Sequence, residues 1–462
     1  MQTDAGARVL GEYVANPSSD AVPAEGRERA KYLILDSIAV SLGGTKLEQG
    51  RAMTRFWDAF GGVGDATVPG AESRLPVLTA AYVNSYLANL LDYDDTYSGR
   101  AVGHPGATVI PPALAVAERE HASGRAFLDA VVAGYEASIR VGDAVMPTPE
   151  RAREVVSTAT WQLFGATAAT AHLLELDADA SADAFALAGV SAPVPAVRKV
   201  GIEEDELHDL KNNYGWGSMG GVKAALLANE GFRGNRTIFD GEKGFWRMAA
   251  SDQYDPAILE EGVRDGPALL DVSFKPYSSC RWSHATLDCV TELAADVGDV
   301  SEVESVTVET FHEARTLDAI PETVLEAQFS IPYVTAVTLL GYPTGFEWLL
   351  EERLDDPRVQ ALAERVSLGE DPEMTADYER SGQMRARVTV DLADGTSMTA
   401  AVDNPSGGPA NPITYDEVES KYEALVEPVL GESTAAELKR RVLAIESETD
   451  VADVARLLGF AE

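Results

Sequence analysis

The spacing of apolar residues changes once along this chain, and that change constrains the fold more than any other feature. Through about the first 260 residues, apolar positions recur at intervals of three and four, as at Leu33, Ile34 and Ile38. This spacing is typical of amphipathic helices. Small residues are frequent in the same region, notably at 165–171 and 182–192. The first part of the chain is therefore predicted to be a compact helical domain.

A different pattern begins near residue 263. Residues 303–311 alternate between apolar and polar, and residues 384–402 are typical of two strands joined by a hairpin turn at 393–395. Helical spacing returns after the turn-rich segment 405–409. We predict a mainly α fold with an α+β part. A large all-helical domain would comprise residues 1–264 and 403–462, and a smaller α+β lid domain, residues 265–402, would be inserted into it.

The charge of the chain restricts its partners. Acidic residues number 75 against 37 basic ones, and the net charge of −38 is spread along the sequence, which contains only nine lysines. An acidic, lysine-poor surface is typical of proteins that stay soluble at high salt, so we predict a halophilic host. The same field repels phosphates and anionic membranes, so neither nucleic acid nor a membrane is expected as a partner.

The sequence predicts a cytoplasmic protein that uses no metal and no cofactor. Its first residues resemble no secretory signal, and no run approaches eighteen consecutive apolar residues. Cys280 and Cys289 are the only cysteines. They are too few for a disulfide framework or for the three thiolates of an aconitase-like iron–sulfur cluster, and they lack zinc-type spacing.

A first candidate site follows an apolar helix, where three aspartates fall within residues 92–95. Burying so much like charge is costly without a purpose. Asp92 and Thr96 are four residues apart and are predicted to share a helical face, and His104 precedes a new helix expected near Val109. An acid, a hydroxyl and an imidazole would then converge. The alternative is that the aspartates cap helices and His104 stabilises a turn.

A second candidate segment, residues 207–222, contains a GxGxxG pattern at Gly215, Gly217 and Gly220. A dinucleotide fingerprint must follow a buried strand, whereas the residues before Gly215 are polar and helix-like. The glycines are therefore predicted to allow close helix packing. Lys211 stands beside amides and an aromatic residue, where it can bind a carboxylate or donate a proton. An ordinary surface lysine is the alternative.

A third candidate segment, residues 274–284, lies at the predicted domain junction. It contains Lys275, Tyr277, Arg281 and His284, so two cations, a phenol and an imidazole are concentrated in an acidic chain. Domain interfaces are common ligand sites, and arginine matches carboxylates with two parallel hydrogen bonds. The alternative is that Arg281 pairs with neighbouring acids and His284 only begins a helix.

Four stretches together carry a resemblance to a known family. They are LLDYDDT…GHPGATVIPPALAVAE at 90–118, FGATAATAHLLELD at 164–177, GGVKAALLANEGFRG at 220–234 and FKPYSSCRWSHATLD at 274–288. The chain resembles the MmgE/PrpD family, which includes 2-methylcitrate dehydratase, cis-aconitate decarboxylase and iminodisuccinate epimerase. The resemblance implies a helical domain with an α+β lid, a homodimer, and an active site between the domains that needs no metal.

The resemblance also assigns roles to residues. By matching motifs, the residues expected to be catalytic are Asp92, Thr96, His104, Lys211 and His284, and those expected to bind substrate are Lys275, Tyr277 and Arg281. Two places depart from the pattern. Residues 156–160 replace a stretch in which relatives often carry a histidine, and Tyr97 stands where many have the histidine of DDTH. Each change removes a candidate acid or base.

The function expected on these grounds is a hydro-lyase that dehydrates a 2-methylcitrate-like or citrate-like acid by general acid–base catalysis. Lys211, Lys275 and Arg281 would hold substrate carboxylates and stabilise enolate-like charge, and His104 or His284 would remove a proton. Three alternatives stay open: decarboxylation of a cis-aconitate-type acid, epimerisation of an imino or amino diacid, and a non-catalytic protein that binds polycarboxylates.

Overall fold

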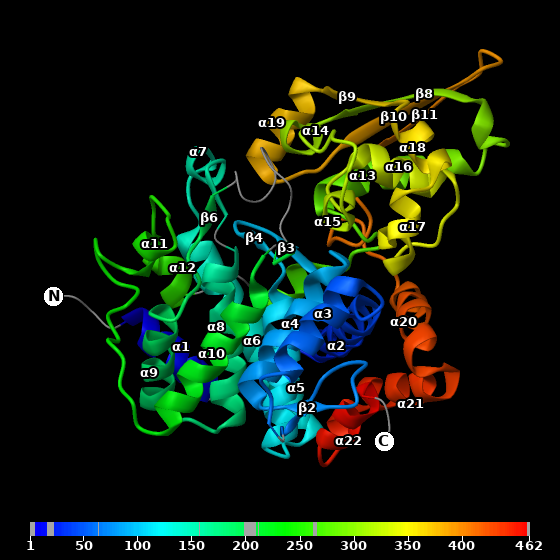
Figure 1. The fold of residues 1–462 in the computed structure, drawn as a ribbon. Coiled ribbons are helices and arrows are strands. Elements are labelled where there is room, and N and C mark those ends of the chain that lie inside the picture. The colour runs from blue at the N-terminus through cyan, green and yellow to red at the C-terminus, as the bar shows by residue number, and fades with distance from the viewer. Residues whose placement is uncertain are drawn as a thin grey trace.

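The computed structural model describes residues 5–15, 23–62, 64–156, 158–197, 209–210, 212–261 and 266–459. Within these ranges the chain is mainly helical with small sheets, which confirms the predicted fold class. Figure 1 shows blue-to-green helices on one side and a yellow and orange group that contains the largest sheet on the other. Among the described residues, no helix has the length and apolar character needed to cross a lipid bilayer.

The first part is built from helices packed around one core. They are α1 (Ala5–Ala15), α2 (Ala24–Gly44), α3 (Glu48–Asp58), α4 (Val77–Leu90), α5 (Pro105–Arg119), α6 (Gly124–Val145), α7 (Pro149–Ala152), α8 (Thr158–Leu173), α9 (Ala178–Gly189), α10 (Tyr214–Asn229), α11 (Phe245–Met248) and α12 (Pro256–Glu261). Helix α8 packs against α6 and α10, and α4 packs against α5 and α10. Phe164 of α8 meets the rings of Phe185, Phe239 and Phe245, which closes the centre of this core.

The glycines of the GxGxxG pattern lie inside α10 and face other helices. A Cβ on Gly215 would stand 2.7 Å from the carbonyl oxygen of Tyr82 in α4. On Gly217 it would stand 3.2 Å from the carbonyl oxygen of Ala159 in α8. The prediction that these glycines permit close helix packing is confirmed.

Short strands interrupt the first part, which was predicted to be all-helical. They are β1 (Ala66–Thr67) with β2 (Arg74–Leu75), β5 (Val155–Val156) with β6 (Ala196–Val197), and the three-stranded sheet β4 (Val102–Gly103), β3 (Thr96–Ser98) and β7 (Val272–Ser273). In the last sheet β3 pairs antiparallel with both β4 and β7. The pairing of β3 with β7 joins the first candidate segment to the residues directly before the third, which are far apart in the sequence.

The second part is a four-stranded sheet covered by helices. Its strands are β8 (Val303–Thr310), β9 (Val366–Glu370), β10 (Ala386–Leu392) and β11 (Ser397–Val402), in the order β11-β10-β8-β9. The pair β10–β11 is the antiparallel hairpin predicted around residues 393–395, and β8 is the strand predicted from alternation. The buried residues of β10 are Ala386, Val388 and Val390, every second position, which follows from the period of two in a strand.

The remaining helices divide between the sheet and the end of the chain. The short helix η2 (Ala268–Asp271) packs on α2 and α6 of the first part. In the second part lie η3 (Arg281–Ser283), α13 (His284–Ala294), η4 (Val300–Glu302), α14 (His312–Arg315), α15 (Val324–Ala327), α16 (Ile331–Leu339), η5 (Phe346–Leu349), α17 (Glu351–Leu354), α18 (Pro357–Ala363) and α19 (Pro372–Ser381). The chain ends with α20 (Tyr415–Leu430), α21 (Glu432–Leu443), η6 (Ile445–Ser447), α22 (Ala452–Ala455) and η7 (Arg456–Leu458). Helix α13 packs on β10 and β11, whereas α20 and α21 pack on α2 of the first part (Figure 1). The domain boundaries at 264/265 and 402/403 stay predictions.

Candidate active site

The segment that follows α4 bends sharply. Helix α4 ends at Leu90, Asp92 has a left-handed backbone (φ 48°), and Thr96 is the first residue of β3. The prediction that Asp92 and Thr96 share a helical face is therefore wrong. Aspartate tolerates the left-handed region better than most residues, because its short side chain can bond locally. The bend lets this segment leave the helix and enter the small sheet with β4 and β7.

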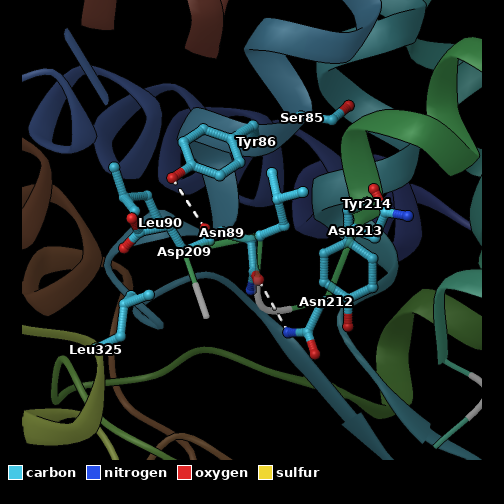
Figure 2. Close-up of a pocket in the computed structure, with 10 residues that line it drawn as sticks. Ser85, Tyr86, Asn89, Leu90, Asp209, Asn212, Asn213, Tyr214 and Leu325 are labelled. Atoms are coloured by element: carbon cyan, nitrogen blue, oxygen red, sulfur yellow. Dashed lines mark hydrogen bonds between the residues drawn. The ribbon is translucent and has the colours of Figure 1, made fainter. Parts of the chain in front are cut away.

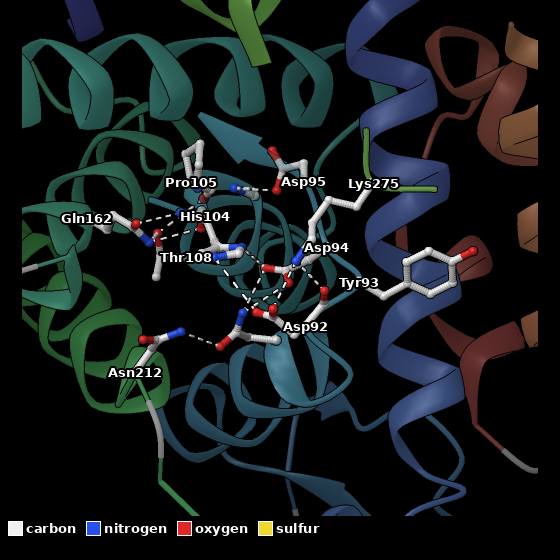
Figure 3. A network of polar contacts seen from close by, with 12 residues as sticks. Asp92, Tyr93, Asp94, Asp95, His104, Pro105, Thr108, Gln162, Asn212 and Lys275 are labelled. Atoms are coloured by element: carbon white, nitrogen blue, oxygen red, sulfur yellow. Dashed lines mark hydrogen bonds and ion pairs between the residues drawn. The ribbon is translucent and has the colours of Figure 1, made fainter. Parts of the chain in front are cut away.

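His104 lies between two of the aspartates. Its Nε2 atom is 3.9 Å from Oδ1 of Asp92, and its Nδ1 atom is 3.3 Å from Oδ2 of Asp94. Figure 3 shows the ring directed at both carboxylates. The His104 side chain keeps 15% of its surface exposed, whereas Asp92 and Asp94 are almost fully buried. His104 is thus the part of this cluster that a ligand can reach.

Lys275 reaches the same cluster from the third segment. Its ammonium lies 3.0 Å from Oδ2 of Asp92 and also donates to the backbone carbonyl of Asp92. The Lys275 side chain is fully buried. Three of the predicted residues, Asp92, His104 and Lys275, therefore meet in one place (Figure 3). A buried carboxylate is costly without a counter-charge, and the Lys275 ammonium supplies one to Asp92.

The backbone of His104 is held by Gln162, a residue that sequence reasoning missed, and the next turn is held by Asp95, which the sequence offered as a helix cap. The side chain of Gln162 accepts a hydrogen bond from the amide of His104 at 2.7 Å and donates one to its carbonyl at 2.9 Å. Asp95 accepts a hydrogen bond from the amide of Gly106 at 3.0 Å. Gln162 lies two residues before the FGA stretch that begins at Phe164, and that closeness was the available signal.

A second chain of amides supports Asp94. The Asn89 amide donates to both carboxylate oxygens of Asp94, at 3.0 and 3.1 Å, and Asn212 donates to Asn89 at 2.9 Å. Both contacts are drawn in Figure 3. Lys211, the predicted catalytic lysine, lies outside the described residues, but its neighbour Asn212 reaches the cluster. In the sequence, Asn212 follows the candidate Lys211, and Asn89 directly precedes the motif that begins at Leu90. That closeness could have indicated both residues.

A narrow pocket opens beside this chain of amides. Figure 2 shows it between the end of α4, the start of α10 and Leu325 of α15. Its lining residues are Ser85, Tyr86, Asn89, Leu90, Asp209, Leu210, Asn212, Asn213, Tyr214 and Leu325. The space is about 10 Å³, room for about one water molecule.

His284 is the first residue of α13 and is fully buried. Arg281 Nη1 lies 3.0 Å from its Nδ1 atom, and its Nε2 atom lies 3.2 Å from the carbonyl of Ser279. A guanidinium only donates and a carbonyl only accepts, so His284 must be neutral with its proton on Nε2. Burial, and then the charges of Arg281 and Lys275, lower the pKa of His284 well below its usual range. Both ring nitrogens are thus engaged by protein groups.

The other residues of the third segment also bond to the protein. The terminal nitrogens of Arg281 donate to the carbonyls of Ser406 at 2.6 Å and Pro405 at 3.1 Å, and burial lowers its pKa to about 10, so it stays protonated at neutral pH. The hydroxyl of Tyr277 donates to Asp288 at 2.9 Å. These contacts hold the turn after β11 against the start of α13.

Thr96 and Tyr97 have different environments in β3. The Thr96 hydroxyl is buried and has no hydrogen-bond partner among the described residues. The hydroxyl of Tyr97 donates to Asp143 at 3.0 Å inside the core. Tyr97, expected from the motif comparison to stand at a position of a possible acid or base, is a buried residue bonded inside the core. In the other departing stretch, the side chain of Val156 and all of Ser157 lie outside the described residues.

Asp92, Asp94 and His104 also have the composition of a metal site. One ligand atom from each lies within 4.8 Å of the others. Carboxylate and imidazole ligands of this kind can hold a divalent transition metal. The Lys275 ammonium, however, already provides a positive charge 3.0 Å from Asp92. A metal would have to bind against that ammonium, so the donor set favours an ion pair over a metal ion.

Asp95 makes the stability of the protein depend on pH. Burial, and then the charge of Asp94, raise the pKa of Asp95 to about 8. Between about pH 4 and 8 the folded state therefore holds a proton that the unfolded state releases, so this group's contribution to the unfolding free energy falls as pH rises. Asp95→Asn removes the titration. We expect the variant to gain stability relative to the unmodified protein across this window, by up to roughly 1.4 kcal/mol per pH unit.

Urea denaturation of both proteins between pH 5 and pH 9 at constant salt checks this expectation. The difference between their unfolding free energies is the relevant quantity, because all other titrating groups cancel in it. A difference that stays constant over the whole range would contradict the raised pKa of Asp95.

Comparison with known proteins matches this chain to one family. The MmgE/PrpD N-terminal domain matches residues 8–257, and the MmgE/PrpD C-terminal domain matches residues 277–447. Together the two matches cover most of the chain and all three candidate segments except the first residues of the third. The chain therefore belongs to the MmgE/PrpD family.

Curated relatives align at low identity. Cis-aconitate decarboxylase of Aspergillus terreus is 25% identical over 471 residues, covering 96% of this chain and 94% of the relative. Cis-aconitate decarboxylase of Homo sapiens is 25% identical over 449 residues, covering 93% and 90%. The 2-methylcitrate dehydratase of Cupriavidus necator is 25% identical over 362 residues, covering 72% and 71%. Relatives with two different activities thus stand at the same identity.

Proposed function

We propose that this protein is a lyase that acts on a small polycarboxylic acid at the cluster formed by Asp92, His104 and Lys275. Membership of the MmgE/PrpD family and the names of the curated relatives support this class of reaction. The observation that carries the proposal is the partly exposed imidazole of His104, which lies between two buried carboxylates and beside a buried ammonium.

In this proposal the residues divide between chemistry and support. His104 exchanges a proton with the substrate, and Asp92 and Asp94 stabilise its imidazolium form. Lys211 and Lys275 supply positive charge toward the substrate carboxylates and the enolate-like charge that develops next to them. Thr96 offers a hydroxyl that is free to bond a ligand. Arg281 and Tyr277, already bonded to protein groups, shape the wall that carries His284.

Decarboxylation is the first candidate reaction. The bond to the leaving carboxylate breaks, its electron pair is delocalised toward a neighbouring carboxylate, and one proton from His104 completes the product as carbon dioxide leaves. Two observations favour it. The decarboxylase relatives align over nearly the whole chain. This reaction requires one proton, which His104 can supply, whereas both nitrogens of His284 are bonded to protein groups.

Dehydration of a 2-methylcitrate-like or citrate-like acid is the second candidate. It needs a base that removes the proton next to a carboxylate and an acid that protonates the leaving hydroxyl. His104 can perform one of these roles, and Lys211 is the residue we propose for the other. The dehydratase relatives favour this reaction, although they align over a smaller part of the chain.

An assay with three acids tests the proposal. The purified protein in concentrated KCl is mixed with cis-aconitate, 2-methylcitrate or citrate, and released carbon dioxide and the absorbance of unsaturated product are followed. Turnover of at least one acid is expected, with carbon dioxide if decarboxylation is correct. A melting temperature raised by these acids without turnover would instead favour a binding protein. Inversion of an imino diacid without either product would favour an epimerase.

The remaining expectations are proposed together with this function. We propose that catalysis needs no metal, so that incubation with EDTA leaves the rate unchanged. We also propose a halophilic, cytoplasmic protein that forms a homodimer with a lid made of residues 265–402. The net charge of −38 supports the halophilic proposal. Such a surface repels an anionic substrate in dilute solution, and concentrated salt screens that repulsion.

A further inference from the structure

A second buried lysine lies directly behind the candidate site. Lys421 belongs to α20, near the end of the chain, and only 7% of its surface is exposed. Its ammonium is 2.6 Å from Oδ1 of Asp36, a fully buried residue of α2. It also donates to the carbonyl of Tyr93 at 2.6 Å and to the carbonyl of Lys275 at 3.1 Å. An ammonium has three hydrogens, and these three acceptors use all of them.

The two carbonyls belong to the two sides of the active-site ion pair. Tyr93 follows Asp92 directly, and Lys275 is the partner of Asp92. Figure 3 shows the backbone at Tyr93 beside the Lys275 side chain, with the Tyr93 ring turned away from His104. That ring lies 3.8 Å from the ammonium of Lys421, which adds a cation–π contact. The Lys421 ammonium thus binds both backbone segments that carry the ion pair of Asp92 and Lys275.

The strand before Lys275 is held in a similar way. Arg29 of α2 donates to the carbonyl of Val272, and its guanidinium lies 4.0 Å from the centre of the Phe274 ring. The backbone between residues 272 and 275 is therefore bonded to cations from α2 and α20. Neither cation is part of the cluster around His104, yet both contact the segment that delivers Lys275 to it.

A purely structural role explains the Lys421–Asp36 pair poorly. Removing two charges from water is costly, and a buried ion pair can often be replaced by neutral or apolar groups without loss of stability. Asp36 has no hydrogen-bond partner among the described residues besides this ion pair. The hydrogens of Lys421 that Asp36 does not use go to the two active-site carbonyls. Because most of the hydrogen bonds of Lys421 go to backbone of the candidate site, we infer that the Lys421–Asp36 pair helps to position that backbone.

We propose that Lys421 is a positioning residue: by binding the carbonyls of Tyr93 and Lys275 it sets the separation of Asp92 and Lys275, and hence the charge beside His104. The proposal rests on the function proposed above, because the pair it positions is part of that active site. Asp36 acts one step further away, since its carboxylate offsets the charge of Lys421 in the interior.

A pair of variants separates positioning from stability. Lys421→Met should lower the melting temperature, because Asp36 is left buried without a counter-charge. Asp36→Asn/Lys421→Met removes both charges and should recover most of that loss. Its kcat should nevertheless stay about 10²-fold below that of the unmodified enzyme, the effect of displacing a catalytic group by about 1 Å, while KM changes much less. Lys439→Met is the control, because Lys439 on the next helix pairs with Glu419 and Glu423 at the surface.

A crystal structure of the double variant gives a readout that does not depend on turnover. The distance from Lys275 Nζ to Asp92 Oδ2, 3.0 Å here, should increase. Recovery of both kcat and this distance would overturn the proposal and leave Lys421 with a structural role. If the unmodified protein turns over none of the acids, the proposed function fails, and the crystal structure still tests the positioning.

A further comparison applies if the double variant does not fold. Asp36→Asn keeps Lys421 and its bonds to both carbonyls, so it should lose far less kcat than Lys421→Met when each is assayed below its own melting temperature. Equal losses in the two single variants would contradict positioning through the carbonyls.

Discussion

His104→Gln is expected to lower kcat/KM by about 10²–10⁴-fold, the usual contribution of a general acid or base. The fold should tolerate the change. Asp94 keeps two hydrogen bonds from Asn89, and Asp92 keeps its ion pair with Lys275. Glutamine is similar in size to histidine and cannot carry a proton between substrate and solvent. Steady-state kinetics on the best acid, together with thermal unfolding, measures both effects.

The matched control is His312→Gln. His312 also faces a carboxylate, with its Nδ1 atom 3.0 Å from Glu370, but it is exposed on the second part. Its replacement should leave kcat/KM and the melting temperature unchanged. A loss of less than threefold in His104→Gln, roughly 0.6 kcal/mol of transition-state stabilisation, would show that another group transfers the proton.

Lys275→Met is expected to abolish turnover and to destabilise the fold by about 3–5 kcal/mol, the usual cost of leaving a buried charge unpaired. The Lys275 ammonium is fully buried and contacts both the carboxylate and the backbone carbonyl of Asp92. Methionine has a similar length and no charge, so Asp92 loses the ammonium that contacts its carboxylate. Chemical denaturation near neutral pH measures the loss of stability.

The double variant Asp92→Asn/Lys275→Met distinguishes the two effects of this change. With both charges removed, most of the stability should return, whereas turnover should not. Full stability in the single variant would show that Asp92 is already neutral in the fold. Turnover in the double variant would show that the reaction does not need the ion pair of Asp92 and Lys275.

Local patterns in the sequence predicted much of the fold. The alternation in residues 303–311 and the hairpin around 393–395 appear as β8, β10 and β11, and the glycines of the GxGxxG pattern pack α10 against α4 and α8. The short strands β1 to β7 were missed, because two or three residues are too few to show alternation. The left-handed backbone at Asp92 was missed for a related reason, since a single bend leaves no periodic trace.

Matching motifs chose the segments of the site but not their contacts. Asp92 and Lys275 are 183 residues apart, and nothing local in either segment specifies that they pair. The engagement of both His284 nitrogens depends on Arg281 and on the carbonyl of Ser279, whose orientations follow from the turn before α13. Gln162 and Lys421 bind backbone groups of the site, and Asn89 binds Asp94 through its amide; no motif in the sequence marks such contacts.

The sequence by itself determined the alternation of helical and strand periodicity, the acidic surface and the family motifs, because each of these is encoded in residues close together in the chain. Only the tertiary structure decided which buried charges are neighbours and which imidazole a ligand can reach. The physical reason is that a buried charge is stabilised by whichever opposite charge or dipole the packing brings within a few ångströms, and such partners come from α2, α20 and the segment after β7 alike.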